Sequence, residues 1–570
     1  MISDSLVTRN MEVFIPELAD AEIDRTRKEI YAYHEGKINE DAFRKFRLEN
    51  GIYGIRFQKD IHMIRVKIPG GMLNAEQLEM LGEIADVFAV GIGHVSTRQN
   101  VQLHWVSLEA VPELLRRLAE VGLNTREACG NTVRNVTACP LAGVSDEEVF
   151  DVTPYTTAVA NYFIRNPVCQ NLPRKFKIAF EGCTTDHAAI AIHDIGARAV
   201  IKDIDGKQVK GFRIYVAGGL STMAIEALLL EDFTPVDQML VTFEAILRIF
   251  DRMGNRENMA RARMKFIVQK VGHEKFRELV LKERMSVWAT RAGDKLWNIV
   301  DEEETSPHNE VKPNHDLLTT GDEKFEKWME TNVRPQKQRG YAYVYVTLPA
   351  GDITSEQFRE LANITRRFTG GKLRTTRTQN LVLRWIQKGE LYNLYTELKR
   401  IGIATPGIHR LANVIGCPGA DTCNLAITHS HRLALELFRE FNNRPDLIHA
   451  EDTKDIHINV SGCPNSCGQH HISPIGFYGS AQRVNEKQAP FYTMLLGGEV
   501  SDGKAIFGQP VTKVPAKRVG EVVVKLIDTY RAQRDNGESF MQWIRRLQKA
   551  ESESGGKRIN EPVVTSRRPS

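Results

Sequence analysis

The sequence predicts an α+β protein in which two copies of one unit are related by pseudo-two-fold symmetry. Residues 66–125 align with residues 346–405 without a gap, at a constant offset of 346 − 66 = 280 residues. Within each copy, short apolar stretches with strand periodicity alternate with stretches of helical periodicity. A repeat of 280 residues is far too long for a solenoid. We therefore expect the two copies to pair and to enclose a site between them.

The aligned positions carry structural detail that chance would not produce. Pro69 and Gly71 match Pro349 and Gly351, and the pair Gln99-Asn100 matches Gln379-Asn380. Each copy is predicted to run through a strand, a turn, a helix, a second strand and a second helix. In the first copy the helix is expected at about residues 75–90, the second strand at 101–105 and the end of the second helix near residue 122.

The repeat also suggests a domain plan. The two related units are expected at 61–128 and 341–408, each followed by an α/β lobe at 129–285 and 409–548. An N-terminal extension of residues 1–60 precedes the first unit, and a polar stretch at 286–340 reads as the connection between the halves. The tail at 549–570 is rich in Ser, Arg and Gly, so it is predicted to be disordered.

Composition narrows the functional classes. The chain has 570 residues, a hydrophobic content of 42% and a net charge of +4, which is ordinary for a globular protein and too small to indicate a nucleic-acid partner. No stretch resembles a membrane span, and the first residues have neither a basic nor an apolar leader segment. We therefore expect a cytoplasmic protein without membrane contact, and a monomer.

Four cysteines in the C-terminal half have the spacing of iron-sulfur ligands. Cys417 and Cys423 form one pair, and Cys463 and Cys467 form another after thirty-nine intervening residues. Four thiolates on two short loops can hold a 4Fe-4S cluster. A structural zinc site is the alternative, but gaps of five and three residues fit its usual ligand spacing poorly. Disulfides are disfavoured because a chain of this size can bury a large core and shows no secretory leader.

The two copies differ at the positions that carry chemistry. Cys139 aligns with Cys417 and Cys183 aligns with Cys463, so the first copy retains two of the four thiols, which we interpret as buried apolar side chains rather than metal ligands. Cations stand in the first copy where the second has neutral residues. The pairs are Arg134 with Ala412, Arg98 with Thr378, and Lys177 with His457. The first half is therefore predicted to bind an anion.

Several motifs resemble those of the sirohaem-dependent sulfite and nitrite reductases, and most closely the ferredoxin-dependent assimilatory sulfite reductases. They are residues 63–71, 96–102, 131–136 and 172–177 together with the cysteine spacing and the duplication, over about residues 53–498. The resemblance implies a duplicated fold with ferredoxin-like half-domains, a sirohaem and a 4Fe-4S cluster. It also implies that Cys467 supplies the sulfur shared by the cluster and the sirohaem iron.

The resemblance assigns roles to six cations. Arg65, Arg134, Lys175 and Lys177 are expected at the substrate face, and Arg98 and Lys265 are expected to pair with carboxylates of the sirohaem. The charges agree with this, because a buried polyanion requires paired cations around it. Arg65 alternates with apolar residues, so the solvated face of a sheet is its alternative interpretation. Lys175 and Lys177 lie two residues apart on an expected strand and therefore point to one side.

The identity of the substrate depends on Lys177. Sulfite reductases of the family have Lys-x-Lys here, as in residues 175–177, where ferredoxin-linked nitrite reductases commonly have Asn. This favours the six-electron reduction of sulfite to sulfide, with reduction of nitrite to ammonium as the alternative. A non-catalytic iron-sulfur electron carrier is a third, more remote possibility. The chain shows no flavin or nicotinamide domain, so the electron donor is expected to be a separate ferredoxin.

A final expectation concerns Tyr53 and Cys129. In some members of the family a tyrosine after Gly-Leu is joined by a thioether to a cysteine five residues before the substrate-face arginine. This chain has Gly51-Ile52-Tyr53, and Cys129 lies five residues before Arg134. The same covalent link is predicted here, and a core tyrosine beside a free thiol is the alternative.

Overall fold

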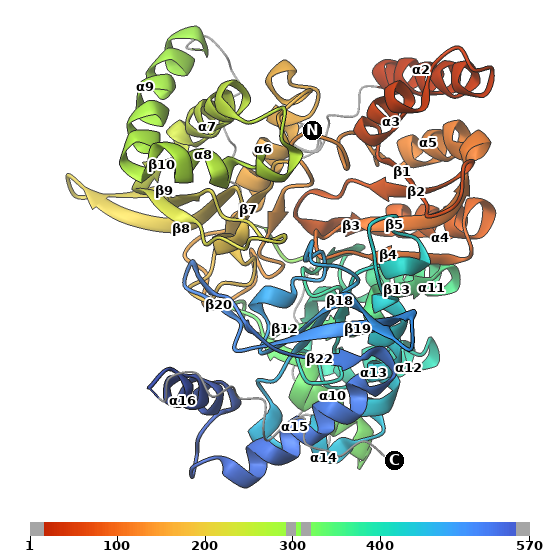
Figure 1. Ribbon diagram of the computed structural model, residues 1–570, viewed down its shortest axis with the longest axis vertical. Coiled ribbons are helices and arrows are strands. Elements are labelled where there is room, and N and C mark those ends of the chain that lie inside the picture. The colour runs from red at the N-terminus through yellow and green to blue at the C-terminus, as the bar shows by residue number, and fades with distance from the viewer. Residues whose placement is uncertain (1–15, 292–303, 309–320, 554–570) are drawn as a thin grey trace.

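Figure 1 shows the computed structural model, which describes residues 16–291, 304–308 and 321–553. Most of the predicted tail and half of the predicted connection, residues 554–570, 292–303 and 309–320, lie outside the described residues. Within the described ranges, no helix is both long and apolar enough to cross a lipid bilayer.

Two antiparallel sheets form the centre of the molecule, one for each copy of the repeat. The first has the order β1 (Ile52–Gly54), β2 (Ile61–Val66), β5 (Val101–Ser107), β4 (Ile92–Val95) and β13 (Asp352–Thr354). The second has the order β11 (Val333–Pro335), β12 (Tyr341–Val346), β15 (Leu381–Gln387), β14 (Lys372–Thr375) and β3 (Met72–Asn74). The predicted order of strands and helices within each copy is confirmed.

The two sheets exchange an edge strand. β13 of the second copy pairs with β4 of the first, with Asp352 opposite His94, and β3 of the first copy pairs with β14 of the second, with Leu73 opposite Leu373. The helices that follow these strands, α4 (Ala75–Phe88) and α11 (Ser355–Phe368), pack against each other. One hydrophobic core therefore runs through both copies, containing for example Val66 and Val346.

The same local signals start the two exchanged helices. Asn74 caps α4 and Thr354 caps α11, and each forms a capping box with a glutamine three residues later, Gln77 and Gln357. These caps satisfy backbone N–H groups that the first helical turn leaves free. A second pair of helices completes the copies, α5 (Val111–Glu120) and α12 (Leu391–Arg400).

Each lobe contains a mixed sheet in which three parallel strands continue into an antiparallel hairpin. In the first lobe the strands are β6 (Thr137–Ala138), β7 (Ile178–Glu181), β8 (Ile195–Ile204), β9 (Lys207–Val216) and β10 (Leu228–Pro235). In the second they are β16 (Ile415–Gly416), β17 (Ile458–Ser461), β18 (Ile475–Val484), β19 (Lys487–Leu496) and β22 (Gln509–Pro515), with a small separate hairpin of β20 (Glu499–Ser501) and β21 (Lys504–Ile506).

Helices cover the lobe sheets and build two further cores. The first lobe has α6 (Thr153–Phe163), α7 (Met239–Met253), α8 (Met264–Val271) and α9 (His273–Arg291). The second has α13 (Ser430–Asn442), α14 (Pro445–Ile448), α15 (Val519–Gln533) and α16 (Phe540–Glu553). α16 extends into the stretch expected to be a disordered tail.

Two stretches expected to lie outside the repeat contribute to it. The first 60 residues contain α2 (Pro16–His34), α3 (Glu40–Glu49) and β1, and β1 forms the outer strand of the first sheet. The stretch expected as a connection contains α10 (Glu323–Asn332) and β11, and β11 takes the matching place in the second sheet. Both edge strands are only three residues long, which explains why periodicity does not reveal them.

Candidate active site

A cavity of about 190 Å³ lies where the first copy, the first lobe and the cysteine loops of the second lobe meet. Residues from distant parts of the chain line it. Nine of the twelve predicted site residues are among them: Tyr53, Arg65, Arg98, Arg134, Lys175, Lys177, Cys417, Cys423 and Cys467. The fold therefore brings the predicted cations and three of the four predicted cluster cysteines to one place.

Arg65 and Arg98 present unpaired donors to this cavity. Arg65 lies on β2 and Arg98 on the turn between β4 and β5, and among the described residues neither Nε atom has a hydrogen-bond partner although both atoms are buried. Burial, reinforced by the neighbouring cation Arg134, lowers the pKa of Arg98 to about 9. Buried donors of this kind are normally satisfied, so they indicate room for an acceptor such as a carboxylate.

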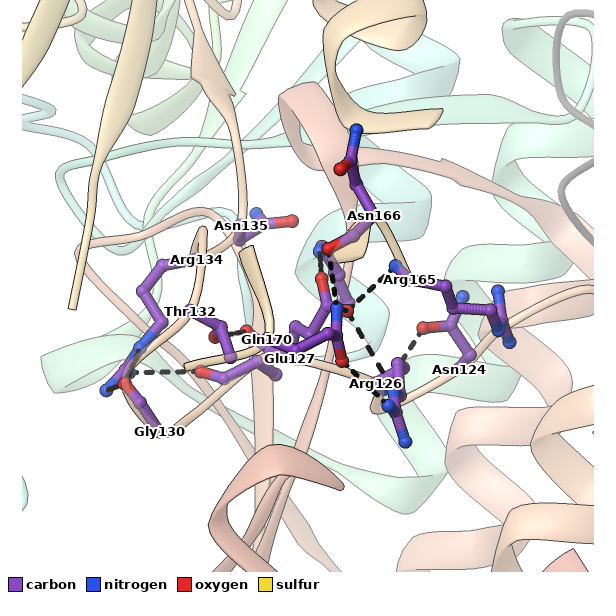
Figure 2. A network of polar contacts seen from close by, with 12 residues as sticks. Asn124, Arg126, Glu127, Gly130, Thr132, Arg134, Asn135, Arg165, Asn166 and Gln170 are labelled. Atoms are coloured by element: carbon purple, nitrogen blue, oxygen red, sulfur yellow. Dashed lines mark hydrogen bonds and ion pairs between the residues drawn. The ribbon is translucent and has the colours of Figure 1, made fainter. Parts of the chain in front are cut away.

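The protein backbone holds Arg134 in place. Its Nε and one terminal nitrogen donate to the carbonyl of Gly130 at 3.0 and 2.7 Å, and the other donates to the carbonyl of Ala128 at 3.2 Å, as Figure 2 shows for Gly130. Burial lowers the pKa of Arg134 to about 10. These neutral acceptors orient the guanidinium without cancelling its charge, so Arg134 keeps its full charge for a bound anion.

A buried network anchors the loop that carries Arg134 (Figure 2). The carboxylate of Glu127 accepts from the backbone N–H of Arg165 and from Nε2 of Gln170, each at 2.8 Å. Its second oxygen lies 3.7 Å from Nζ of Lys67, and both side chains are buried. Lys67 and Arg65 are thus separated in function, because Lys67 balances a structural carboxylate and Arg65 faces the cavity.

Lys175 and Lys177 stand side by side at the cavity wall. The residue between them, Phe176, bridges Val133 in a strand-like pairing and points into the core, so both lysines point the other way. Within the described part of the chain, neither ammonium group has a hydrogen-bond or ion-pair partner. Burial lowers the pKa of Lys175 to about 8, and burial with the adjacent Lys175 lowers that of Lys177.

The cluster cysteines follow the ends of two parallel strands. Cys417 comes directly after β16, and Cys463 lies just beyond β17, so their loops leave the sheet side by side. The N–H of Gly462 donates to Sγ of Cys417 at 3.2 Å. Among the described residues, no three of the four predicted cluster sulfurs lie within 4.8 Å of one another. A single zinc ion requires a tighter set, whereas a four-iron cube holds its thiolates farther apart.

Cys467 differs from the other cysteines because it is exposed at the cavity. Its carbonyl accepts a hydrogen bond from Oγ1 of Thr97 at 2.9 Å, which ties its loop to the turn that carries Arg98. The next residue is Gly468, where a Cβ atom would lie 2.2 Å from the carbonyl oxygen of Val460. Only glycine fits there, so the turn after Cys467 can pass directly over β17.

Three predicted site residues lie outside the cavity lining: Lys265, Cys463 and Cys129. The ammonium of Lys265 donates to the carbonyls of Gly219, Leu220 and Met223, so it stabilises the loop after β9. Cys129 is buried. Burial is the main cause of the raised pKa of Tyr53, and Cys423 and Cys129 both add to it, so the two predicted link partners lie near each other.

The structure adds a group that the sequence left without a role. Asp352, on the exchanged strand β13, accepts from Nδ1 of His94 at 3.0 Å and contacts Nε2 of His431 at 3.0 Å. Burial opposes ionisation of Asp352, but the bonds from His431 and His94 outweigh it and lower its pKa. His94 lines the cavity, so this chain of side chains connects the second copy to the site. The strand exchange creates it, and no sequence pattern announces that exchange.

Comparison with known proteins agrees with this arrangement. Residues 129–287 and 408–551 match the family described as nitrite and sulphite reductase 4Fe-4S domain, and residues 56–121 and 334–401 match the nitrite/sulfite reductase ferredoxin-like half domain. The solved structure of the Mycobacterium tuberculosis NirA protein superimposes with a TM-score of 0.77 and 27% identity over 94% of this chain and 97% of that one.

Curated relatives cover almost the whole chain. A sulfite reductase [ferredoxin] of Mycobacterium tuberculosis is 30% identical over 85% of this chain and 82% of its own. An assimilatory ferredoxin-dependent nitrite reductase of Haloferax mediterranei is 27% identical over 95% of this chain and 92% of its own. The two matched domain types each occur twice, in the order of the repeat. The chain therefore belongs to the nitrite and sulfite reductase family, and it is an oxidoreductase whose cofactors are a sirohaem and a 4Fe-4S cluster.

Proposed function

We propose that the protein reduces sulfite to sulfide with six electrons delivered by a ferredoxin. The balanced reaction consumes one sulfite, six electrons and seven protons and yields hydrosulfide and three waters. The observation that carries the proposal is the group of four cations, Arg65, Arg134, Lys175 and Lys177, in one cavity with Cys467. The Mycobacterium tuberculosis relative named sulfite reductase [ferredoxin] supports both the substrate and the donor.

The donors present in the cavity fit the family's cofactors. Sirohaem carries eight carboxylates, and the unpaired buried Nε atoms of Arg65 and Arg98 are suitable partners for such groups. In this proposal Cys417, Cys423, Cys463 and Cys467 hold the cluster. Lys265 would join the haem partners only by giving up a carbonyl acceptor, so we propose that it positions the loop of residues 217–223.

Sirohaem, when bound, supplies an iron that can take the substrate, and the cluster supplies it with electrons. The residues of the chain hold the anion and provide protons. Lys175 and Lys177 together offset the charge of sulfite beside the carboxylates of the macrocycle. A pKa of about 8 suits Nζ of Lys175 for donating a proton near neutral pH and regaining it from water. Arg134 stays charged throughout and keeps the anion oriented.

Cys467 is proposed as the point where electrons enter the catalytic cavity. It is the exposed member of the four cysteines, whereas Cys417 and Cys463 are buried. In this proposal its thiolate is shared between the cluster and the haem iron. Ferredoxin would reduce the cluster from outside, one electron at a time, so six encounters complete one turnover. The chain thereby separates electron delivery in the second lobe from anion binding in the first.

The test compares the two substrates in one protein. Steady-state turnover of anaerobically purified, sirohaem-loaded enzyme with reduced viologen is measured as sulfide from sulfite and as ammonium from nitrite. We expect a higher kcat/KM for sulfite, and we expect Lys177→Asn to lower the sulfite value about 10-fold or more while nitrite changes far less. Lys207→Asn, on the exposed β8–β9 turn, is the matched control and should change neither value. Equal losses on both substrates would contradict the role given to Lys177.

Reduction of nitrite to ammonium is the second candidate. The Haloferax mediterranei relative, named as a nitrite reductase, covers 95% of this chain, and the cation cavity would also accept this smaller monoanion. A higher kcat/KM for nitrite in the same assay would select this function and leave the cofactors and electron path unchanged. An iron-sulfur carrier without catalysis would show neither activity and no haem absorption.

We also propose the thioether between Tyr53 and Cys129. Tyr53 lines the cavity, and the thiol of Cys129 is close enough to contribute to the raised pKa of the phenol. Link formation removes two hydrogen atoms, so peptide mass spectrometry of the intact holoenzyme should find residues 53 and 129 in one cross-linked peptide lighter by that mass. Separate, unmodified peptides in a fully active sample would contradict the proposal.

A further inference from the structure

A second group of metal-ligating side chains lies in the first lobe, far along the chain from the cluster cysteines. Cys139 follows β6 and Cys183 lies just after β7, and these strands are parallel neighbours. His187 comes four residues after Cys183, and Glu181 is the last residue of β7. All but His187 are buried, and the side chain of His187 is 23% exposed.

The repeat explains why these residues meet. Cys139 and Cys183 occupy the positions of Cys417 and Cys463, and 187 + 280 = 467, so His187 occupies the position of Cys467. Three of the four ligand positions of the cluster loops therefore keep a metal-binding side chain in the first copy. The carboxylate of Glu181 completes this second group of four.

The distances between the four ligand atoms are those of a single tetrahedral ion. The sulfurs of Cys139 and Cys183 are 3.7 Å apart, and Sγ of Cys139 is 3.5 Å from Nδ1 of His187. Oε1 of Glu181 is 3.8 Å from the same nitrogen, and all four ligand atoms lie within 4.8 Å of one another. Tetrahedral zinc with ordinary bond lengths requires about 3.8 Å between two sulfurs and about 3.5 Å between sulfur and nitrogen.

We propose that Cys139, Cys183, His187 and Glu181 bind a structural zinc ion. Two thiolates, an imidazole and a carboxylate are zinc ligands, and a closed four-ligand set is typical of a structural site. The ion fastens the ends of β6 and β7 in the first lobe, as the cluster fastens β16 and β17 in the second. It also neutralises Glu181, which is fully buried.

Neighbouring groups orient the proposed ligands. The two oxygens of Glu181 accept from the backbone N–H of Cys183 at 2.9 Å and of Ala188 at 2.8 Å, which fixes the carboxylate beside the sulfurs. The carbonyl of His187 accepts from Nε of Arg377 at 3.3 Å. His187 also borders a cavity of about 220 Å³, which gives a metal ion a path to the site.

Two other states of this cluster are possible outcomes of a test. The sulfurs lie well beyond the bonding distance of a disulfide, about 2.05 Å, in this structure. The four side chains could instead stay metal-free and hydrogen-bond to one another. Neither alternative requires zinc, so metal content distinguishes them from the proposal.

The experiment measures zinc and iron in holoenzyme produced in zinc-supplemented medium. We expect about one zinc per chain that survives desalting, and a zinc X-ray absorption spectrum with two sulfur neighbours at about 2.3 Å. Cys183→Ser should lose most of the zinc and keep its iron. Cys169→Ser, at a buried free cysteine outside the group, is the matched control and should keep both metals.

The absorption spectrum of the unaltered holoenzyme tests the site even if Cys183→Ser does not fold. Zinc-free holoenzyme, or zinc bound by four sulfurs or by none, would overturn the proposal. So would zinc that persists in a folded Cys183→Ser variant, because it would then occupy the cluster cysteines or the surface. A Cys139–Cys183 disulfide in peptides of the native protein would overturn it as well.

Discussion

The two halves of the molecule use one backbone for different chemistry. Each has an antiparallel sheet with an exchanged edge strand, a lobe with three parallel strands, and two loops that leave neighbouring strand ends. The second half places four cysteines on and around these loops, and the first places Cys139, Cys183 and His187 at equivalent positions. Metal-binding geometry thus belongs to the shared scaffold, and a few side chains decide which metal it suits.

The cavities of the two halves differ in the same manner. The cavity beside His187 is lined by Tyr345, Thr378 and His457, which stand at the positions of Arg65, Arg98 and Lys177. The shape of an enclosed space is therefore retained in both halves, but its fixed cations are concentrated in the first. Duplication supplied two similar cavities, and side-chain replacement left one of them suited to a doubly charged anion.

The largest effect should come from removing one cluster cysteine. We expect Cys417→Ser to lose most of the cluster iron and to lower turnover by about 10³-fold or more, because three thiolates on these loops cannot hold the cube against solvent. Its counterpart Cys139→Ser should keep the cluster iron. Iron analysis and visible absorption of both purified variants measure the difference. Equal iron loss would mean that the two halves do not separate these roles.

A second test concerns positions where the halves should behave alike. Gly71 and Gly351 both have positive φ, 72° and 84°, and a Cβ atom would lie 2.5 Å from the carbonyl oxygen of Thr375 or 2.6 Å from that of Val95. Each alanine substitution should destabilise the protein by about 2–4 kcal/mol, because it strains the turn before an exchanged strand. Calorimetry should show Tm values lowered by similar amounts. A large effect at only one site would show that the exchange is not symmetric in energy.

The sequence predicted what depends on repetition and periodicity. The constant offset located both copies, and matched residue pairs such as Pro69 and Pro349 marked the same turns. The cation cavity was also predictable, because Arg65, Arg134 and Lys177 occur in motifs whose order can be compared between copies and with a family. Such signals are local in the sequence, so they can be read without a structure.

The missing parts depend on contacts between segments far apart in the chain. The exchange of β3 and β13 leaves the local pattern of each strand unchanged, so periodicity cannot reveal it. Lys265 looked like a partner for an anion, but its ammonium instead meets three carbonyls of a loop. His187 could have been found by applying the offset of 280 to Cys467, because that position carries a ligand in both copies.

A third test asks what the cation cavity costs in stability. Burial lowers the pKa of Lys175 from 10.5 to about 8, so at pH 7 the folded protein without sirohaem holds an unfavourable charge. Lys175→Met should stabilise that sirohaem-free protein by about 1–3 kcal/mol at pH 7. The unfolded state binds the extra proton between pH 8 and 10.5, so the unaltered protein gains stability over this window and the difference shrinks.

Urea unfolding of both proteins at pH 7 and pH 10 measures this difference. Lys207→Met, at an exposed lysine on the β8–β9 turn, serves as the control and should show little change at either pH. A Lys175→Met variant that is less stable than the unaltered protein at pH 7 would show that the lysine has a structural partner.

The smallest expected effect tests the helix caps that the two halves share. Asn74→Ala and Thr354→Ala each remove a side chain that accepts from the N–H of Gln77 or Gln357 and so closes a capping box. Each change should cost about 1 kcal/mol. Because α4 and α11 pack against each other, opening one helix end loosens the contact for the other, and the double variant should lose less stability than the sum of the two single variants. Urea unfolding of the four proteins gives this coupling, and strict additivity would mean that the exchanged helices begin independently.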